Sequence, residues 1–201
     1  MKEFWDERYA QEDYVYGEMP NEFFREQLIG LHPGNLLLPG EGEGRNAVWA
    51  ARNGWKVTAV DYSVQARVKA TGLAERQQLT TINYLIGDIT EYTFPENTFR
   101  CIALIFVHLE PKQRALFHEK MCRSLAPGGL LILEAFTPEQ LNYDSGGPRN
   151  PEMLYTTEML SNDFQSLDLK LLQTTKPLLN EGPYHSGLAS TVRMSATKPL
   201  S

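Results

Sequence analysis

Cysteine, long apolar runs and positive charge are all scarce in this chain. Of its 201 residues only Cys101 and Cys122 are cysteines, and two thiols make no disulfide framework. Neither lies at a spacing typical of metal ligands, so no metal site is expected. Their apolar surroundings indicate buried free thiols in a reducing compartment. No apolar run is long enough to cross a bilayer, and the charged start, MKEFWDERYAQ, lacks the apolar region of a signal peptide. These features predict a cytoplasmic protein with no membrane segment.

Acidic residues outnumber basic ones, 25 to 19, which gives a formal net charge of −6. Such a balance does not favour long-range attraction to nucleic acid or to anionic lipid, and neither is expected as a partner. No internal repeat or low-complexity tract is present. Hydrophobic residues make up 42% and charged residues 22%, which are ordinary globular values. The length predicts one domain over residues 1–201, as a monomer or weak dimer.

Short apolar runs alternate with helical patterns through most of the chain. Apolar runs with no polar face are typical of a parallel sheet that helices cover on both sides. Two final strand-like runs, joined by a glycine-containing loop, predict an antiparallel pair at the end of that sheet. Asn21 and Ser63 are expected to cap helices. We expect strands near residues 35–40, 56–62, 81–88, 101–108, 130–136, 167–179 and 188–197, and helices within 1–20, 21–34, 45–54, 63–78, 111–129 and 156–164.

The stretch LLLPGEGEGRNA places Gly40, Gly42 and Gly44 between an apolar run and a helical pattern. Glycines at such a junction let a ligand approach the backbone closely. A dinucleotide would bring a pyrophosphate to this helix start, but Glu41 and Glu43 would repel it by about 1–4 kcal/mol at a separation near 4 Å. A cationic ligand without phosphate, such as S-adenosylmethionine, fits these acids better.

Acidic residues also end the next two predicted strands. Asp61 ends the run VTAVD, where a carboxylate can accept hydrogen bonds from both hydroxyls of a ribose. Asp88 ends the run LIGD, where it could accept a bond from an adenine amino group. Two structural roles stay open, because Asp61 could simply precede a helix and Asp88 could serve a turn.

The segments LLLPGEGEGRNAVWAARNGWKVTAVDYS, LIGDIT and LAPGGLLILEAF together resemble class I S-adenosylmethionine-dependent methyltransferases, from about Asn35 to Phe136. The resemblance implies a Rossmann-like α/β fold with a seven-stranded, mostly parallel sheet, a C-terminal antiparallel hairpin strand and helices on both faces. It also implies S-adenosyl-L-methionine as cofactor. The residues expected to bind it are Arg8, Tyr16, Gly40, Glu41, Gly42, Gly44, Asn46, Asp61, Tyr62, Ser63, Gly87, Asp88, Ile89 and Phe106.

A narrower resemblance, to the tellurite-resistance and thiopurine methyltransferase branch, comes from FWDERYAQEDYVYGEMPNEFF and YHSGLASTVR. It implies that residues 1–34 form a lid over a cofactor-binding core at 35–136, while 137–201 form the acceptor side. It also implies a small-molecule acceptor with a soft sulfur or chalcogen nucleophile. The branch carries a His-Arg pair in its tail, whereas Ser186 follows His185 here, so oxyanion chemistry stays open. Lid residues implied are Trp5, Arg8, Tyr9, Tyr14 and Tyr16, with Arg8 facing the methionine carboxylate.

Methyl transfer needs alignment and exclusion of water rather than an enzyme nucleophile, so none is sought. The acceptor should instead meet the loops at the carboxyl edge of the sheet. Structural roles stay open for His108, His185 and Arg193. The expected acceptor-side residues are His108, Tyr143, Arg149, Tyr184, His185 and Arg193, of which His108, Tyr184, His185 and Arg193 are the catalytic candidates.

Two other functions remain compatible with the sequence. A nicotinamide-dependent oxidoreductase would use the same glycine loop, although the third glycine typical of that motif is absent. A cofactor-binding module without catalysis would bind the nucleoside and leave the acceptor side blocked.

Overall fold

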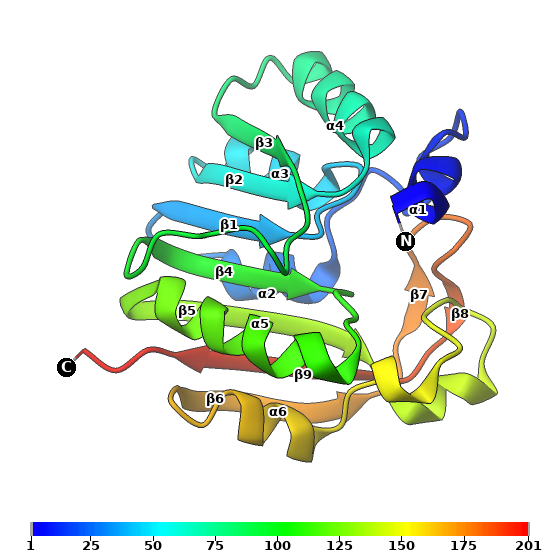
Figure 1. Cartoon of the computed structure of the whole chain (residues 1–201). Coiled ribbons are helices and arrows are strands. Elements are labelled where there is room, and N and C mark those ends of the chain that lie inside the picture. Colours follow the sequence, from blue (N-terminus) through cyan, green and yellow to red (C-terminus); the bar gives the residue numbers. More distant parts are fainter. Residues whose placement is uncertain (1, 201) are drawn as a thin grey trace.

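The structure is a computed structural model that describes residues 2–200. Its centre is a seven-stranded sheet of order β3-β2-β1-β4-β5-β9-β6 in which only β9 runs antiparallel to its neighbours. This confirms the mostly parallel α/β sheet. In Figure 1 the parallel strands all point toward the side where α1 and the β7–β8 hairpin lie. The strands are β1 (Asn35–Pro39), β2 (Lys56–Asp61), β3 (Ile82–Ile86), β4 (Phe99–Ile105), β5 (Leu125–Phe136), β6 (Asp168–Thr175) and β9 (Thr191–Thr197).

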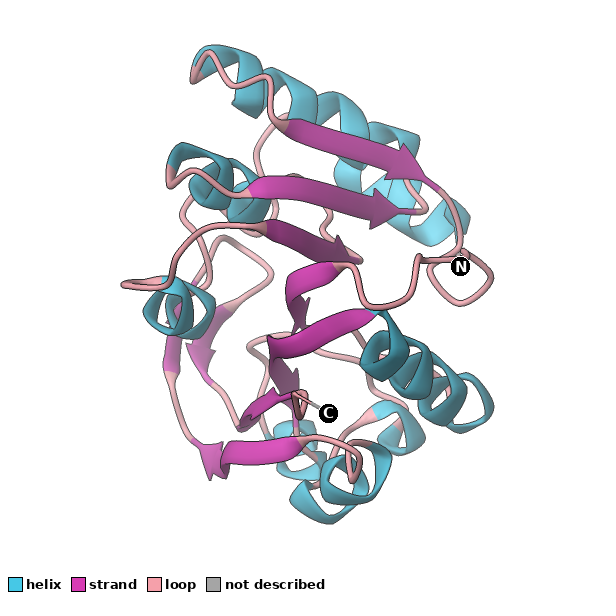
Figure 2. Ribbon diagram, turned by 90° about the vertical axis from the view of Figure 1, so that its left-hand side faces the viewer, coloured by secondary structure: helices cyan, strands magenta, loops and turns pink. Residues whose placement is uncertain are grey.

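Alternate residues of each central strand feed two separate cores. In β4, Ile102 and Leu104 join one buried cluster, while Cys101 and Ala103 join the cluster on the opposite face. Because side chains alternate across a strand, an all-apolar strand is stable only when both faces are covered. Helices cover both faces (Figure 2), and the two predicted thiols, Cys101 and Cys122, are both buried.

The helices begin where the sequence places polar caps. Asn21 Oδ1 accepts the N–H of Phe24 at 2.8 Å, and Ser63 Oγ accepts that of Ala66 at 3.1 Å, which confirms both caps. The helices are α1 (Lys2–Tyr9), α2 (Glu22–Leu28), α3 (Arg45–Arg52), α4 (Val64–Arg76), α5 (Pro111–Ser124) and α6 (Thr157–Asp163), with 3₁₀ turns at Pro138–Asn142 and Pro151–Met153. None of the helices within residues 2–200 is long and apolar enough to span a membrane.

Two helix ends differ from the prediction. Helix α5 ends at Ser124, because Leu125 is already extended and pairs with Phe99 at the start of β5. The following Pro127 could not have continued the helix. Helix α2 ends at Leu28, so Leu31, which is within the range predicted for this helix, lies outside it and is exposed.

His118 is a polar residue of α5, yet it does not lie on the surface of that helix. The side chain is buried on the inward face of α5, with Nδ1 at 2.8 Å from Asp163 Oδ2 on α6. The same carboxylate accepts a bond from Arg114 Nε at 2.7 Å. These polar side chains of α5 therefore join it to α6.

The tail forms two structures where the sequence predicted one strand pair. Strands β6 and β9 are antiparallel neighbours in the main sheet, but the run expected over residues 167–179 is broken at Pro177. Proline lacks the N–H that a continued ladder would use. Beyond it, β7 (Leu178–Asn180) pairs with β8 (Ser186–Leu188) in a separate hairpin at the carboxyl edge of the main sheet (Figure 1).

Candidate functional site

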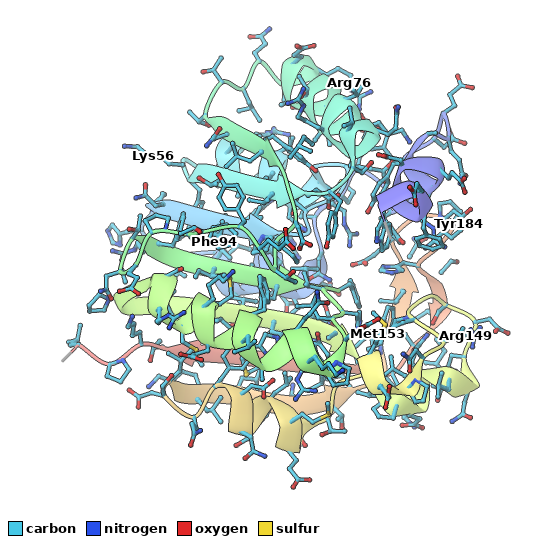
Figure 3. The ribbon with its side chains drawn as sticks, viewed as in Figure 1. Lys56, Arg76, Phe94, Arg149, Met153 and Tyr184 are labelled. Carbon is cyan, nitrogen blue, oxygen red and sulfur yellow. The ribbon has the colours of Figure 1, made fainter. Side chains whose placement is uncertain are left out.

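A cavity of about 510 Å³ lies at the carboxyl edge of the sheet, a size suited to a small ligand. The N-terminal segment covers it, with Trp5, Arg8 and Tyr16 among its walls. The loop after β5 and the β7–β8 connection complete it (Figure 3 shows Met153 and Arg149 on the first of these). The expected site residues that line it are Arg8, Tyr16, Gly40, Glu41, Asn46, Asp61, Tyr62, Ile89, Phe106, His108, Arg149 and His185.

Other expected site residues lie outside the cavity wall. Asp88 Oδ1 accepts the N–H and the hydroxyl of Thr90, both at 2.7 Å, in the turn that was left open as an alternative. Tyr184 lies over the guanidinium of Arg8 and beside α1 (Figure 3). The residues that the structure does not bring to the wall are Gly42, Gly44, Ser63, Gly87, Asp88, Tyr143, Tyr184 and Arg193.

The three loop glycines have different roles, although the sequence suggested one. Gly40 lines the cavity with a φ of +66°. Gly44 has a φ of +90°, and a Cβ there would lie 2.6 Å from the Cβ of Ala70, so this glycine permits close packing of α3 on α4. Among the three, only Gly40 exposes its backbone to a ligand in the cavity.

Asp61 fastens the glycine loop to the start of α4. Its Oδ2 accepts the N–H of Gly42 at 2.9 Å and its Oδ1 accepts that of Ser63 at 3.0 Å. Gly42 packs under Tyr9, whose Oη would lie 2.7 Å from a Cβ at that position. Burial raises the pKa of Asp61 to about 6 despite these bonds. Asp61 also lines the cavity, so its structural role does not remove it from the cavity wall.

Glu41 lies at the start of α3. Its Oε1 accepts the N–H of Ala47 at 2.7 Å, and Asn46 Nδ2 lies at 3.4 Å from Oε2. Burial raises the pKa of Glu41 to about 7, because these bonds do not offset its loss of water. Neither Glu41 nor Asp61 forms an ion pair with any described residue.

Glu43 also lines the cavity, but its carboxylate is held by Lys69 and by the N-terminal segment. Its carboxylate pairs with Lys69 Nζ at 2.8 Å and accepts the backbone N–H groups of Val15 and Tyr16 at 3.2 and 3.3 Å. Arg45 Nη1 donates to the carbonyl of Tyr16 at 3.1 Å. Glu43, the second acid of the glycine loop, therefore anchors the N-terminal segment. From the sequence, Glu41 and Glu43 had been given the same role, as acids that repel a pyrophosphate.

His108 has no free nitrogen with which to accept a proton. Its Nδ1 donates to the carbonyl of Met153 at 2.7 Å, and its Nε2 accepts the N–H of Phe136 at 3.2 Å. Burial lowers the pKa of His108 to about 4, so the ring is neutral near pH 7. This side chain forms a wall of the cavity, which agrees with the structural alternative.

Arg193 lies away from this cavity. It is on β9, an inner strand of the sheet, and its Nε donates to Glu134 Oε1 at 2.7 Å. Its neighbours include Phe23, whose ring centre is 5.1 Å from the guanidinium carbon. The structure therefore places Arg193 in an ion pair within the sheet and not at the cavity where the acceptor is expected.

His185 is, besides His108, a catalytic candidate that the structure brings to the cavity. Its ring lies among three aromatic rings, with centroid distances of 4.5 Å to Tyr16, 4.5 Å to Phe106 and 5.3 Å to Phe136. Burial lowers its pKa below the ordinary histidine value. The imidazole is therefore neutral near pH 7.

Glu41→Gln is expected to change the pH dependence of stability in the ligand-free protein. Between its ordinary pKa of 4.5 and its folded pKa of about 7, the folded protein holds a proton that the unfolded chain has lost. Stability from this group therefore falls as pH rises through that window, by at most about 3 kcal/mol. Glutamine keeps an acceptor for Ala47, so unfolding in urea should show the variant gaining about 1–3 kcal/mol over the wild type between about pH 5 and about pH 8.

Glu96→Gln serves as the matched control, because the Glu96 side chain is exposed and its carboxylate lies 3.8 Å from Arg123 Nε. It should follow the wild type at both pH values. A stability difference for Glu41→Gln that stays constant from about pH 5 to about pH 8 would contradict the raised pKa.

Comparison with known proteins agrees with this geometry. Residues 37–129 match the family described as a methyltransferase domain. A curated relative, the 2-heptyl-1-hydroxyquinolin-4(1H)-one methyltransferase of Mycobacteroides abscessus, is 26% identical over 141 residues. The match covers 69% of this chain and 62% of the relative, so the chain spans less than two thirds of that protein's length.

Two solved structures share the fold over almost the whole chain. The N-methyltransferase NodS of Bradyrhizobium japonicum WM9, in complex with S-adenosyl-L-homocysteine, has a TM-score of 0.74 at 18% identity and matches 98% of each chain. TehB of Haemophilus influenzae has a TM-score of 0.73 at 16% identity, over 98% of this chain and 66% of TehB. These near-equal scores do not separate the tellurite-resistance branch from others. Residues 37–129 are therefore similar to a methyltransferase domain, and almost the whole chain shares the fold of the solved NodS structure.

Proposed function

We propose that this protein transfers the methyl group of S-adenosyl-L-methionine to a small-molecule acceptor. The observation that carries the proposal is a pair of carboxylates in one cavity wall, Asp61 buried and Glu41 partly buried, without an ion-pair partner among the described residues. The acids Glu43, Glu134 and Glu181 each pair with a lysine, arginine or histidine. Desolvated carboxylates favour a ligand that brings positive charge and hydroxyl donors.

Different residues of the cavity wall would bind the methionine, ribose and adenine portions of this cofactor. Glu41 would face the ammonium of the methionine portion, and Asp61 would accept the ribose hydroxyls. Tyr62 and Ile89 offer flat apolar walls for the adenine. When bound, the cofactor supplies a methyl group on a positively charged sulfur. The chain holds the two reactants in line and excludes water, for which Trp5 and the rest of the N-terminal segment provide the cover.

The acceptor end of the cavity is aromatic and apolar. Phe106 and Phe136 stack with centroids 4.6 Å apart, and His108 stacks on Phe136 at 5.7 Å. A thiol or another soft, uncharged nucleophile on a small flat molecule suits these walls better than a hydrated oxyanion does. Arg149, one of the arginines of the cavity wall, is largely exposed and pairs with Asp144. The curated relative is named for a hydroxyquinolone, so a hydroxyl group is the second acceptor type to test.

Calorimetry with S-adenosyl-L-methionine, S-adenosyl-L-homocysteine and a nicotinamide dinucleotide tests the cofactor assignment. We expect the first two to bind and the third not to bind. Asp61→Asn should weaken binding by about 1–3 kcal/mol, the usual effect of losing hydrogen bonds to a charged group. Glu96→Gln, far from the cavity wall, should leave affinity unchanged.

If only the dinucleotide binds, the oxidoreductase alternative is supported. If none of the three ligands binds, both the methyltransferase and the oxidoreductase are contradicted. If the cofactor binds, methyl transfer to small thiols and phenols is measured next. Tight binding without transfer to any of them would support the non-catalytic alternative.

A further inference from the structure

Glu181 lies behind His185 and holds three partners at once. Its Oε2 accepts a bond from Arg45 Nη2 at 2.9 Å and lies 3.3 Å from His185 Nδ1. Its Oε1 accepts a bond from Asn21 Nδ2 at 3.1 Å. Burial alone would raise the pKa of Glu181, but His185 and Arg45 together lower it to about 2. The group is therefore a carboxylate throughout the working pH range.

An anionic acceptor at Nδ1 fixes which nitrogen of His185 carries the proton. Nδ1–H donates to Glu181, so Nε2 carries the lone pair. Nε2 has no hydrogen-bond partner among the described residues, and Ser124 Oγ is the only buried, unpartnered side-chain oxygen or nitrogen within them. Since Nε2 has no partner and is not among the fully buried atoms, it is accessible. His185 lines the cavity, so a ligand in the cavity can reach this lone pair.

The charged groups around this ring favour its neutral form. Arg45 from α3 and Arg8 from the N-terminal segment both disfavour a second positive charge, whereas Glu181 favours it. The other neighbour that can titrate is Tyr16, whose ring centre is 4.5 Å away. Across the cavity wall His108 is neutral and uses both nitrogens. His185 is thus the one histidine of the cavity wall that is able to accept a proton.

We infer that His185 is the base that deprotonates an acceptor bearing an O–H or S–H group, and that Glu181 positions it. This inference rests on the proposed methyl transfer. It limits the acceptors to molecules whose nucleophilic atom X still carries its proton when it enters the site. An aromatic or heteroaromatic hydroxyl or thiol meets both this requirement and the aromatic walls.

The step balances without a further reactant. The X–H bond breaks, its electron pair stays on X, and the proton forms a bond to Nε2, so His185 becomes an imidazolium next to the Glu181 carboxylate. The electron pair on X then forms the bond to the methyl carbon while the carbon–sulfur bond breaks toward sulfur. The imidazolium afterwards returns its proton to solvent. Glu181 stabilises the charged ring through the bond at Nδ1.

A series of para-substituted phenols and thiophenols tests this assignment, because their X–H acidity varies while the aromatic ring and the position of X on it stay the same. With the least acidic members, His185→Asn should lower kcat/KM by about 100-fold or more, and Glu181→Gln by about 10-fold, with less change in KM. With members already ionised at the assay pH, both losses should shrink to below about threefold. Glu96→Gln should match the wild type throughout.

A second readout does not depend on turnover. Nitrogen NMR of histidine-labelled protein should show His185 as the neutral Nδ1–H form near pH 7, with the signal assigned from His185→Asn. In Glu181→Gln the balance between the two neutral forms should shift toward Nε2–H, and the pH profile of kcat should move with it.

Three results would overturn the inference. One is an equal loss across the whole acidity series, which would leave His185 a packing residue. Another is an NMR signal of the Nε2–H form in the wild type. The third is transfer to none of the series by a wild-type protein that binds the cofactor. Failure of the proposed function looks different, because the cofactor itself would then not bind.

Discussion

Gly40→Asp is expected to weaken binding of S-adenosyl-L-homocysteine by more than about 100-fold. Gly40 lines the cavity at a φ of +66°, which L side chains rarely adopt, and its Cβ would lie 3.1 Å from Val107 Cγ2. The new carboxylate would stand in a wall that already holds Glu41 and Asp61. Like charges near 4 Å repel by about 1–4 kcal/mol, and the side chain also removes space from the ligand. Calorimetry measures the loss.

Gly72→Ala is the matched control for this substitution. Gly72 lies inside α4, has an ordinary helical φ and would bring its Cβ within 4 Å of nothing. Alanine there should raise the free energy of unfolding by about 1 kcal/mol and leave binding unchanged. Circular dichroism of Gly40→Asp must still show folded protein. If such a folded variant binds within about threefold of the wild type, the ligand does not lie against the glycine loop.

Arg193→Met is expected to lower the free energy of unfolding by about 3–5 kcal/mol. Glu134 is completely buried, and Arg193 is the cation that pairs with it, at 2.7 Å. Asn21 Nδ2 and Thr191 Oγ1 would still donate to the carboxylate, at 2.7 and 3.1 Å, but neither carries charge. Removing one partner of a buried ion pair leaves an uncompensated charge, which costs more than the pair itself contributes. Urea unfolding measures the change.

The double variant Glu134→Gln/Arg193→Met should recover part of this loss, because no buried charge is then left unpaired. Arg76→Met is the surface control, since its pair with Glu18 is half exposed on both sides and should contribute less than about 1 kcal/mol. If Arg193→Met lowers stability no more than Arg76→Met does, Glu134 is compensated by other groups.

The parts of the fold that the sequence predicted correctly depend on local pattern. The all-apolar run of β4 required cover on both faces, and Asn21 and Ser63 stood directly before helical periodicity. Parallel strands bring their carboxyl ends to one edge, so Gly40 and Asp61 were expected to meet there, and both line the cavity.

The parts that failed depend on partners distant in the chain. Pro177 alone could have shown that the last predicted run would break before the hairpin, because proline ends a ladder. No comparable signal marks His118, whose partner Asp163 is 45 residues away. Glu181, which the sequence analysis missed, gains its role from Arg45, 136 residues distant.

The sequence by itself determined the parallel α/β sheet, the place of the ligand edge and the acid-flanked glycine loop. Each follows from the period of apolar residues or from glycine, proline and cap chemistry, which act over a few residues. Only the tertiary structure decided that Glu43 pairs with Lys69 and anchors the N-terminal segment, while Glu41 has no ion-pair partner among the described residues. It also decided that His185 keeps a free nitrogen while His108 does not. Glu41 and Glu43 carry the same chemical group, and so do His185 and His108. What separates the members of each pair is which donors, acceptors and apolar walls folding brings to each side chain, and that depends on contacts between residues far apart in the chain.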